Sequence, residues 1–189
     1  SEPFEPMTIA PLLYQQATAQ EKQILQTQYD VREFKIMTIK QERIFADKIL
    51  AAEFYYERGQ FFDVSKHLFD LCIMLQTERI QSLISCPQKM VAMLAYKRQE
   101  EQYRIGSDLS KKPFSEFQIF SAISENDELA ESFYRMQKIY VFDENDVISY
   151  EELETSMAEL NNILLDLDEE LAFNPHEQGP TFDFTMGSI

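Results

Sequence analysis

The side chains best suited to chemistry in this sequence are Lys48 on one predicted helix and Lys66, His67 and Asp70 on the next. Lys48 lies at the edge of an apolar helical stripe rather than on the polar face. Asp70 follows Lys66 by four residues and His67 by three, so these three share one helical face. A lysine can bind phosphate as a point charge, and an aspartate can orient a nucleophile or take its proton. Paired with a metal site, these side chains could handle a nucleotide phosphate, but these residues contain no such metal site.

Each of these residues also has a structural explanation. Lys48 can extend along its apolar neighbours to reach water or an acid, and Asp70 can form a local ion pair with Lys66. Arg43 and Asp47, four residues apart, are expected to form a structural ion pair. These alternatives leave the function of the four residues open.

The elements that must position these side chains are helices. The stretch 40–58 has an apolar stripe and ends at Gly59, a residue that commonly follows the last turn of a helix. The stretch 64–75 is apolar on nearly all sides, which is typical of a buried helix. Further helices are predicted over 78–85, 87–104, 115–123, 126–139 and 150–172. The last begins with a capping box, Ser149 to Glu152.

Residues 34–39 alternate between apolar and polar side chains and form the one good strand candidate. A single strand leaves its backbone groups without partners, so we expect the edge of a sheet whose other strands lie elsewhere. This predicts that the chain is truncated.

The predicted fold is mainly α, a helical bundle with at most one or two short strands. Its expected divisions are an irregular or helical lead-in (1–33), a helical core with one edge strand (34–112), acidic C-terminal helices (113–173) and an irregular tail (174–189).

Composition narrows the class of protein. A hydrophobic content of 44% is that of a globular chain, and four glycines argue against a glycine-rich dinucleotide fold. No apolar stretch approaches the ~20 residues that span a bilayer. Cys72 and Cys86 lie in or beside apolar helical patterns, as expected for reduced cysteines of a cytoplasmic protein, although a disulfide between them is possible.

The net charge of -16 is unevenly distributed. Residues 1–112 contain 15 basic and 15 acidic residues, whereas residues 113–189 contain 2 basic and 18 acidic ones. This argues against nucleic acid lying along the C-terminal part and leaves room for a local basic pocket in the N-terminal part.

No metal site is legible. Residues 141–152 resemble a calcium loop but place Asp146 where glycine is required. Asp166 and Asp168 lie within one helix and face different directions. The stretch 106–108 lacks the strand-to-helix context of a phosphate loop.

The motifs Glu42-Arg43-x-Phe45-x-x-Lys48, Tyr56-x-Arg58-Gly59 and Ser65-Lys66-His67-Leu68-Phe69-Asp70-Leu71 resemble the C-terminal half of the AbiEii/AbiGii abortive-infection nucleotidyltransferases. The usual family form has Thr where this chain has Ile44, Arg where it has Lys66 and Tyr where it has Phe69. The segment from Met136 to Phe142, followed by 149–152, is similar to the closing helices of the family. The resemblance covers residues 30–165.

The resemblance implies a toxin of a bacterial toxin–antitoxin system with a polymerase-β-like fold. In it, Lys48 matches the lysine that contacts nucleotide phosphate, Asp70 matches the late aspartate of a hydrophobic-x-Asp motif, and Lys66 with His67 matches the basic pair before it. Asp70 is the predicted catalytic residue. The metal motif of the family, Gly-Ser followed by Asp-x-Asp, would lie upstream and is absent here. Mg²⁺ is therefore expected only with a missing N-terminal half.

These observations predict the C-terminal part of an AbiEii-like nucleotidyltransferase, which transfers a nucleotide from an NTP to RNA or another acceptor and is inactive alone. An antitoxin protein is a possible partner, and no membrane is expected. The alternatives are a non-catalytic all-α protein-interaction module and, less favoured, a degenerate EF-hand protein.

Overall fold

The computed structural model describes residues 4–104 and 108–173 and divides into two units, Ser1–Lys40 and Gln41–Ile189. The tail predicted over 174–189 and most of the stretch 106–108 lie outside the described residues. The division after Lys40 assigns the predicted strand to the first unit rather than to the helical core.

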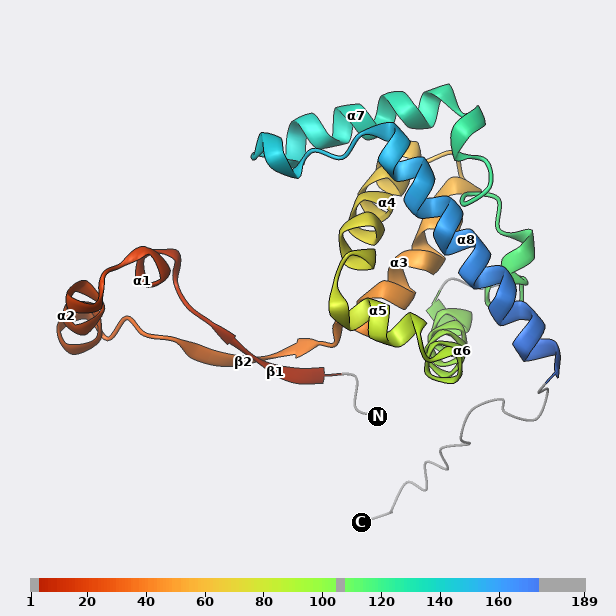
Figure 1. Cartoon of the computed structure of the whole chain (residues 1–189). Coiled ribbons are helices and arrows are strands. Elements are labelled where there is room, and N and C mark those ends of the chain that lie inside the picture. Colours follow the sequence, from red (N-terminus) through yellow and green to blue (C-terminus); the bar gives the residue numbers. More distant parts are fainter. Residues whose placement is uncertain (1–3, 105–107, 174–189) are drawn as a thin grey trace, which may run out of the picture. The chain divides into compact units, whose positions relative to one another are not determined.

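The first unit is a two-stranded antiparallel ribbon whose strands, β1 (Phe4–Ile9) and β2 (Phe34–Ile39), are joined by two helices, α1 (Leu12–Gln16) and α2 (Ala19–Tyr29) (Figure 1). The prediction of a strand without a partner in this chain was wrong, because β2 pairs with β1 along its whole length. Pro6 within β1 concealed that strand, since proline is uncommon inside paired strands. The expected irregular start is therefore a strand followed by helices.

Both faces of the ribbon carry apolar side chains. Phe4 lies opposite Ile39 on one face, and Met7 lies opposite Ile36 on the other. These four side chains are 39–50% exposed, and Tyr14 is the buried residue among those described in this unit. Helix α2 begins with a capping box between Thr18 and Glu21, so its end is satisfied locally rather than by packing.

The second unit is helical. Its α-helices are α3 (Gln41–Tyr56), α4 (Phe61–Leu75), α5 (Glu78–Ile84), α6 (Pro87–Arg104), α7 (Asp127–Tyr140) and α8 (Tyr150–Phe173). Short 3-10 turns occur at η1 (Asp108–Ser110), η2 (Phe114–Glu116), η3 (Ile123–Glu125) and η4 (Glu144–Asp146). The prediction of a mainly α fold with one or two short strands is confirmed.

The predicted helix over 115–123 is wrong. That stretch consists of η2 and the turn that leads to η3. The backbone N–H groups of Gln118 and Ile119 donate to the Glu53 carboxylate, so a partner from α3 takes the donors that a helix would use internally.

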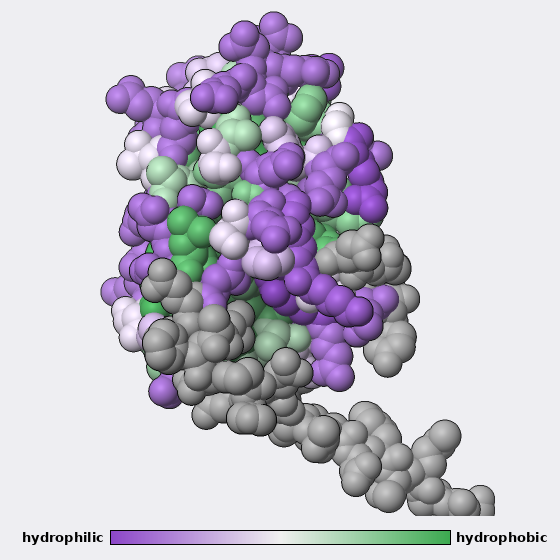
Figure 2. Space-filling view, turned by 90° about the vertical axis from the view of Figure 1, so that its right-hand side faces the viewer, coloured by the Kyte–Doolittle hydropathy of each residue, from purple (hydrophilic) through white to green (hydrophobic). Residues whose placement is uncertain are grey.

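Helix α4 lies at the centre of this unit, against α3, α7 and α8 (Figure 1). Its apolar residues explain this position, because Val64, Leu68 and Leu71 are fully buried. Helix α8 covers the same core with a stripe at three- and four-residue spacing: Leu153, Met157, Leu160, Leu164 and Leu167. The face turned to the viewer in Figure 2 is mainly hydrophilic, with small hydrophobic areas between polar side chains.

Candidate functional site

Helices α3 and α4 form a hairpin that carries all four predicted site residues. The chain reverses at Gly59, whose φ of +64° lies in the left-handed region that favours glycine. Ile49 and Ala52 of α3 are fully buried, as is Leu68 of α4. This apolar packing sets which residues at the edge of each helix face one another.

Lys48 and Asp70, 22 residues apart in the sequence, meet across the hairpin. The Lys48 ammonium forms an ion pair with Asp70 Oδ2. The Lys48 side chain is 24% exposed and that of Asp70 is 43% exposed, so the pair lies at the edge of the core and remains open to solvent. The alternative pairing of Asp70 with Lys66 is not what the structure shows.

His67 lies beside this pair as a neutral imidazole. Its ring stacks on Tyr55, with centroids 5.3 Å apart and planes at 18°. Burial, and then the positive charge of Lys48, lower the pKa of His67 from 6.5 to about 4. Its Nδ1 is buried and has no hydrogen-bond partner among the described residues. At neutral pH, His67 therefore adds no positive charge to the site, unlike the basic pair that the resemblance implied.

Lys66 points away from Asp70 towards other partners. Its ammonium donates to Asp63 Oδ1 at 2.9 Å and lies 4.8 Å from the centroid of the Phe62 ring and 5.6 Å from that of Tyr140. The hydrogen bond to Asp63 raises the pKa of Lys66, so this lysine stays charged. The four predicted residues thus form two groups: the Lys48–Asp70 pair with His67, and Lys66 with Asp63.

A family model described as "Nucleotidyl transferase AbiEii toxin, Type IV TA system" matches residues 2–164. This chain belongs to the AbiEii toxin family. No curated protein and no solved structure matches it. The resemblance read from the α3 and α4 motifs is confirmed, and the match extends through the ribbon of the first unit. Membership in a toxin–antitoxin family implies an antitoxin partner.

Two further ion pairs hold α3 of this AbiEii chain against α6. Arg43 binds both carboxylate oxygens of Glu100 at 2.5 and 2.6 Å, and Asp47 pairs with Lys97, whose side chain is 5% exposed. The predicted ion pair between Arg43 and Asp47 was wrong, because each residue has a closer partner on α6. Their role is structural, as expected, but it joins two helices instead of stabilising one.

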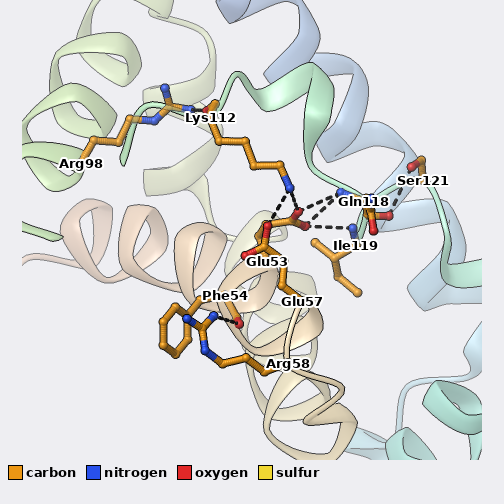
Figure 3. A network of polar contacts seen from close by, with 9 residues as sticks. All are labelled: Glu53, Phe54, Glu57, Arg58, Arg98, Lys112, Gln118, Ile119 and Ser121. Carbon is orange, nitrogen blue, oxygen red and sulfur yellow. Dashed lines mark hydrogen bonds and ion pairs between the residues drawn. The ribbon is translucent and has the colours of Figure 1, made fainter. Parts of the chain in front are cut away.

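Glu53 of α3, which was not among the predicted site residues, is the most buried charge of the described residues. Its side chain is fully buried and accepts hydrogen bonds from the Lys112 ammonium at 2.5 Å and from the backbone N–H groups of Gln118 and Ile119 at 3.0 Å (Figure 3). Burial opposes the charge of Lys112, but its hydrogen bonds to Glu53 and Glu57 outweigh burial and raise its pKa. Glu53 follows Ile49 by four residues, so its place on the apolar stripe was the indication in the sequence.

Three other acidic residues accept hydrogen bonds from backbone N–H groups. Asp143 accepts from the backbone N–H of Asn145, and Glu152 accepts from that of Ser149. Asp168 accepts from the backbone N–H of Ser115 at 2.7 Å, which ties α8 to η2. Within residues 4–104 and 108–173, no three His, Cys, Asp or Glu side chains lie close enough to hold a metal ion.

Cys72 and Cys86 are both free thiols. Burial raises the pKa of Cys72 to about 11, so this thiol is a core residue rather than a nucleophile. No helix in the described part of this AbiEii chain has the length and apolar character needed to cross a membrane.

Proposed function

We propose that this chain supplies the helical, substrate-positioning part of an AbiEii nucleotidyltransferase, which transfers a nucleotide from an NTP to RNA or another acceptor. The observation that carries the proposal is the partly exposed Lys48–Asp70 ion pair that joins the two family motifs. Family membership supports the reaction class, and the ion pair supports a shared role for the two residues.

In this proposal, Lys48 holds the nucleotide phosphates and Asp70 acts on the acceptor hydroxyl. The phosphate competes with Asp70 for the Lys48 ammonium, which releases the carboxylate from its ion pair. Asp70 then accepts the proton of the attacking hydroxyl. At the same time the hydroxyl oxygen bonds to the α-phosphorus, and pyrophosphate leaves. The neighbouring His67, neutral at pH 7, contributes shape and apolar contact rather than charge.

Lys66 and His67 belong to the substrate-binding residues of this proposal, with Asp70 as the catalytic residue. The described residues do not fit a Mg²⁺ site, because they bring no three suitable ligands together. We therefore place Mg²⁺ on a separate metal-binding part and derive no step through it. The chain alone is then expected to lack transferase activity.

Two measurements on the purified 189-residue protein test the proposal. The first is incorporation of labelled NTP into RNA in the presence of Mg²⁺, for which we expect no product; product would overturn the proposed inactivity. The second is titration with a fluorescent NTP analogue. A Lys48→Ala change is expected to weaken binding about tenfold, the cost of about 1.4 kcal/mol. The matched control is Lys89→Ala, at an exposed lysine of α6.

A second candidate function, a non-catalytic protein-interaction module, is favoured by the pairing of the site cations with carboxylates. In that case Lys48–Asp70 and Lys66–Asp63 only stabilise the hairpin. The same titration separates the two functions. For an interaction module, the unmodified chain and the Lys48→Ala variant are expected to bind the NTP analogue equally weakly.

A further inference from the structure

A group of exposed and half-buried cations and aromatic rings lies where α4 packs against α7. We define the α4–α7 surface by Phe62 and Lys66 of α4 and Arg135 and Tyr140 of α7. The centroid of the Phe62 ring is 4.8 Å from the Lys66 ammonium and 5.0 Å from the Arg135 guanidinium. The rings of Phe62 and Tyr140 are 6.3 Å apart and tilted by 46°. Two cations and two aromatic rings thus form one continuous surface.

The charge of this surface contrasts with the acidic C-terminal part. Arg135 and Lys138 are the 2 basic residues within 113–189, and their three-residue spacing places them on one face of α7. Arg135 is exposed and has no carboxylate partner within the described part of the chain. Lys66 is the second cation of the α4–α7 surface, and Asp63 partly offsets its charge. The surface thus carries two cations beside an acidic C-terminal part.

Aromatic side chains at this end of α7 are largely exposed. Tyr140 is 55% exposed, and Phe142, two residues later, is 95% exposed. Covering an exposed aromatic ring with an apolar or planar partner lowers the free energy. A nucleotide of a nucleic acid suits both features, because its phosphate satisfies the cation while its base covers the ring.

We propose that the α4–α7 surface binds a single-stranded segment of the acceptor nucleic acid, an inference that rests on the proposed transfer to RNA. A base covers Tyr140, and the adjoining phosphate lies between Arg135 and Lys66. Lys66 immediately precedes His67 and lies one helical turn before Asp70, so a strand held here leads along α4 towards the Lys48–Asp70 pair.

A single strand fits better than a duplex because binding requires an exposed base face. In a duplex the bases are stacked on one another, and only phosphates would reach Arg135 and Lys66. A protein partner would cover the aromatic rings equally well but would not require the cations. The proposal therefore predicts that both the ring of Tyr140 and the charge of Arg135 contribute to binding.

The test measures binding of the full 189-residue chain to a fluorescein-labelled RNA 12-mer, of about one site size, by anisotropy over a range of salt concentrations without NTP. The variants are Tyr140→Ala and Arg135→Gln. The matched controls are Tyr29→Ala, at a 68% exposed tyrosine of α2, and Lys89→Gln, at an exposed lysine of α6. Circular dichroism checks that each variant keeps its helix content.

Tyr140→Ala is expected to weaken binding at least about fivefold, the low end of the loss for one stacked base. Arg135→Gln is expected to reduce the slope of log K against log salt by about 0.7, the value for one phosphate contact on a single strand. Both controls are expected to bind as the unmodified chain does, and the annealed duplex is expected to bind more weakly.

Absence of binding at low salt, equal affinity of all variants, or preference for the duplex would each overturn the proposal. These outcomes are separable from failure of the proposed function, because no nucleotide is transferred in the assay. If RNA binds as expected while Lys48→Ala leaves NTP binding unchanged, the surface stands and the catalytic proposal fails. If the reverse is found, the catalytic proposal stands and the acceptor binds elsewhere.

Discussion

Two lysine–carboxylate pairs that each involve one residue of α3, Glu53–Lys112 and Lys48–Asp70, differ in burial and in the number of groups that contact the carboxylate. Glu53 is fully buried, and one ammonium and two backbone N–H groups donate to it. Asp70 is 43% exposed, and its described ion-pair partner is Lys48. Both pairs join α3 to another part of the same unit, so the contrast lies in their surroundings rather than in their chemistry.

Burial determines what each carboxylate can do. A buried carboxylate whose lone pairs are filled by fixed donors has no capacity left for a ligand, and losing it leaves those donors unsatisfied. A half-exposed carboxylate with one flexible partner can exchange that partner at low cost. The comparison therefore assigns Glu53 to stability and leaves Asp70 available for chemistry.

Removing the buried carboxylate is the strongest test of this contrast. A Glu53→Ala change is expected to lower the free energy of unfolding by about 3–5 kcal/mol, because it leaves the buried N–H of Ile119 and the partly buried N–H of Gln118 without their acceptor. Urea unfolding followed by circular dichroism measures the loss.

Glu57→Ala is the control for Glu53→Ala, because Glu57 also binds Lys112 but its side chain is 39% exposed. We expect a loss of less than about 1 kcal/mol from this change. Similar losses in the two variants would show that burial is not what distinguishes the pairs.

The contrast also shows what could be read from the sequence. The helices of the second unit were mostly predicted, because their apolar spacing and end residues are local features. The helix expected over 115–123 failed because Glu53, far away in the sequence, takes its backbone donors. The ribbon was not predicted, because β1 is recognisable only through its pairing with β2, about 30 residues away.

At the candidate site, patterns in the sequence suggested candidate residues but did not predict how they pair. Spacing within one helix suggested Lys66 with Asp70 and Arg43 with Asp47, whereas the structure pairs Asp70 with Lys48 and Asp47 with Lys97. Pairs between helices depend on the rotation of each helix, which the packing of the whole core sets. The roles of Lys48, Lys66, His67 and Asp70 in the reaction remain predictions.

His67, which is neutral in the folded chain, makes the free energy of unfolding depend on pH. Its pKa is about 4 in the folded chain against 6.5 when unfolded, so the unfolded chain binds more protons between these values. The contribution of His67 to the free energy of unfolding is therefore fully present above pH 6.5 and is lost as the pH decreases towards 4. We expect His67 to account for a loss of about 2 kcal/mol at pH 4, a figure reduced for its partial exposure.

A His67→Phe variant isolates this effect, because phenylalanine keeps the stacking on Tyr55 but cannot take up a proton. The difference in unfolding free energy between pH 7 and pH 4 is measured for both proteins. The carboxylates titrate in both, so their contribution cancels in the comparison. An equal pH dependence of the two proteins would mean that His67 keeps an ordinary pKa in the folded chain.

The exposed pair is expected to show the smallest effect on stability. Lys48→Met keeps the apolar stem and Asp70→Asn keeps the shape, so each removes mainly charge. A double-mutant cycle of the two by urea unfolding is expected to give a coupling energy below about 1 kcal/mol. Lys48→Met also removes one cause of the lowered pKa of His67, so that pKa should rise, which NMR titration of the imidazole measures. A coupling of several kcal/mol would instead place Lys48–Asp70 with Glu53 as a structural pair, since a pair that costs so much to separate could not exchange its partner for a nucleotide phosphate.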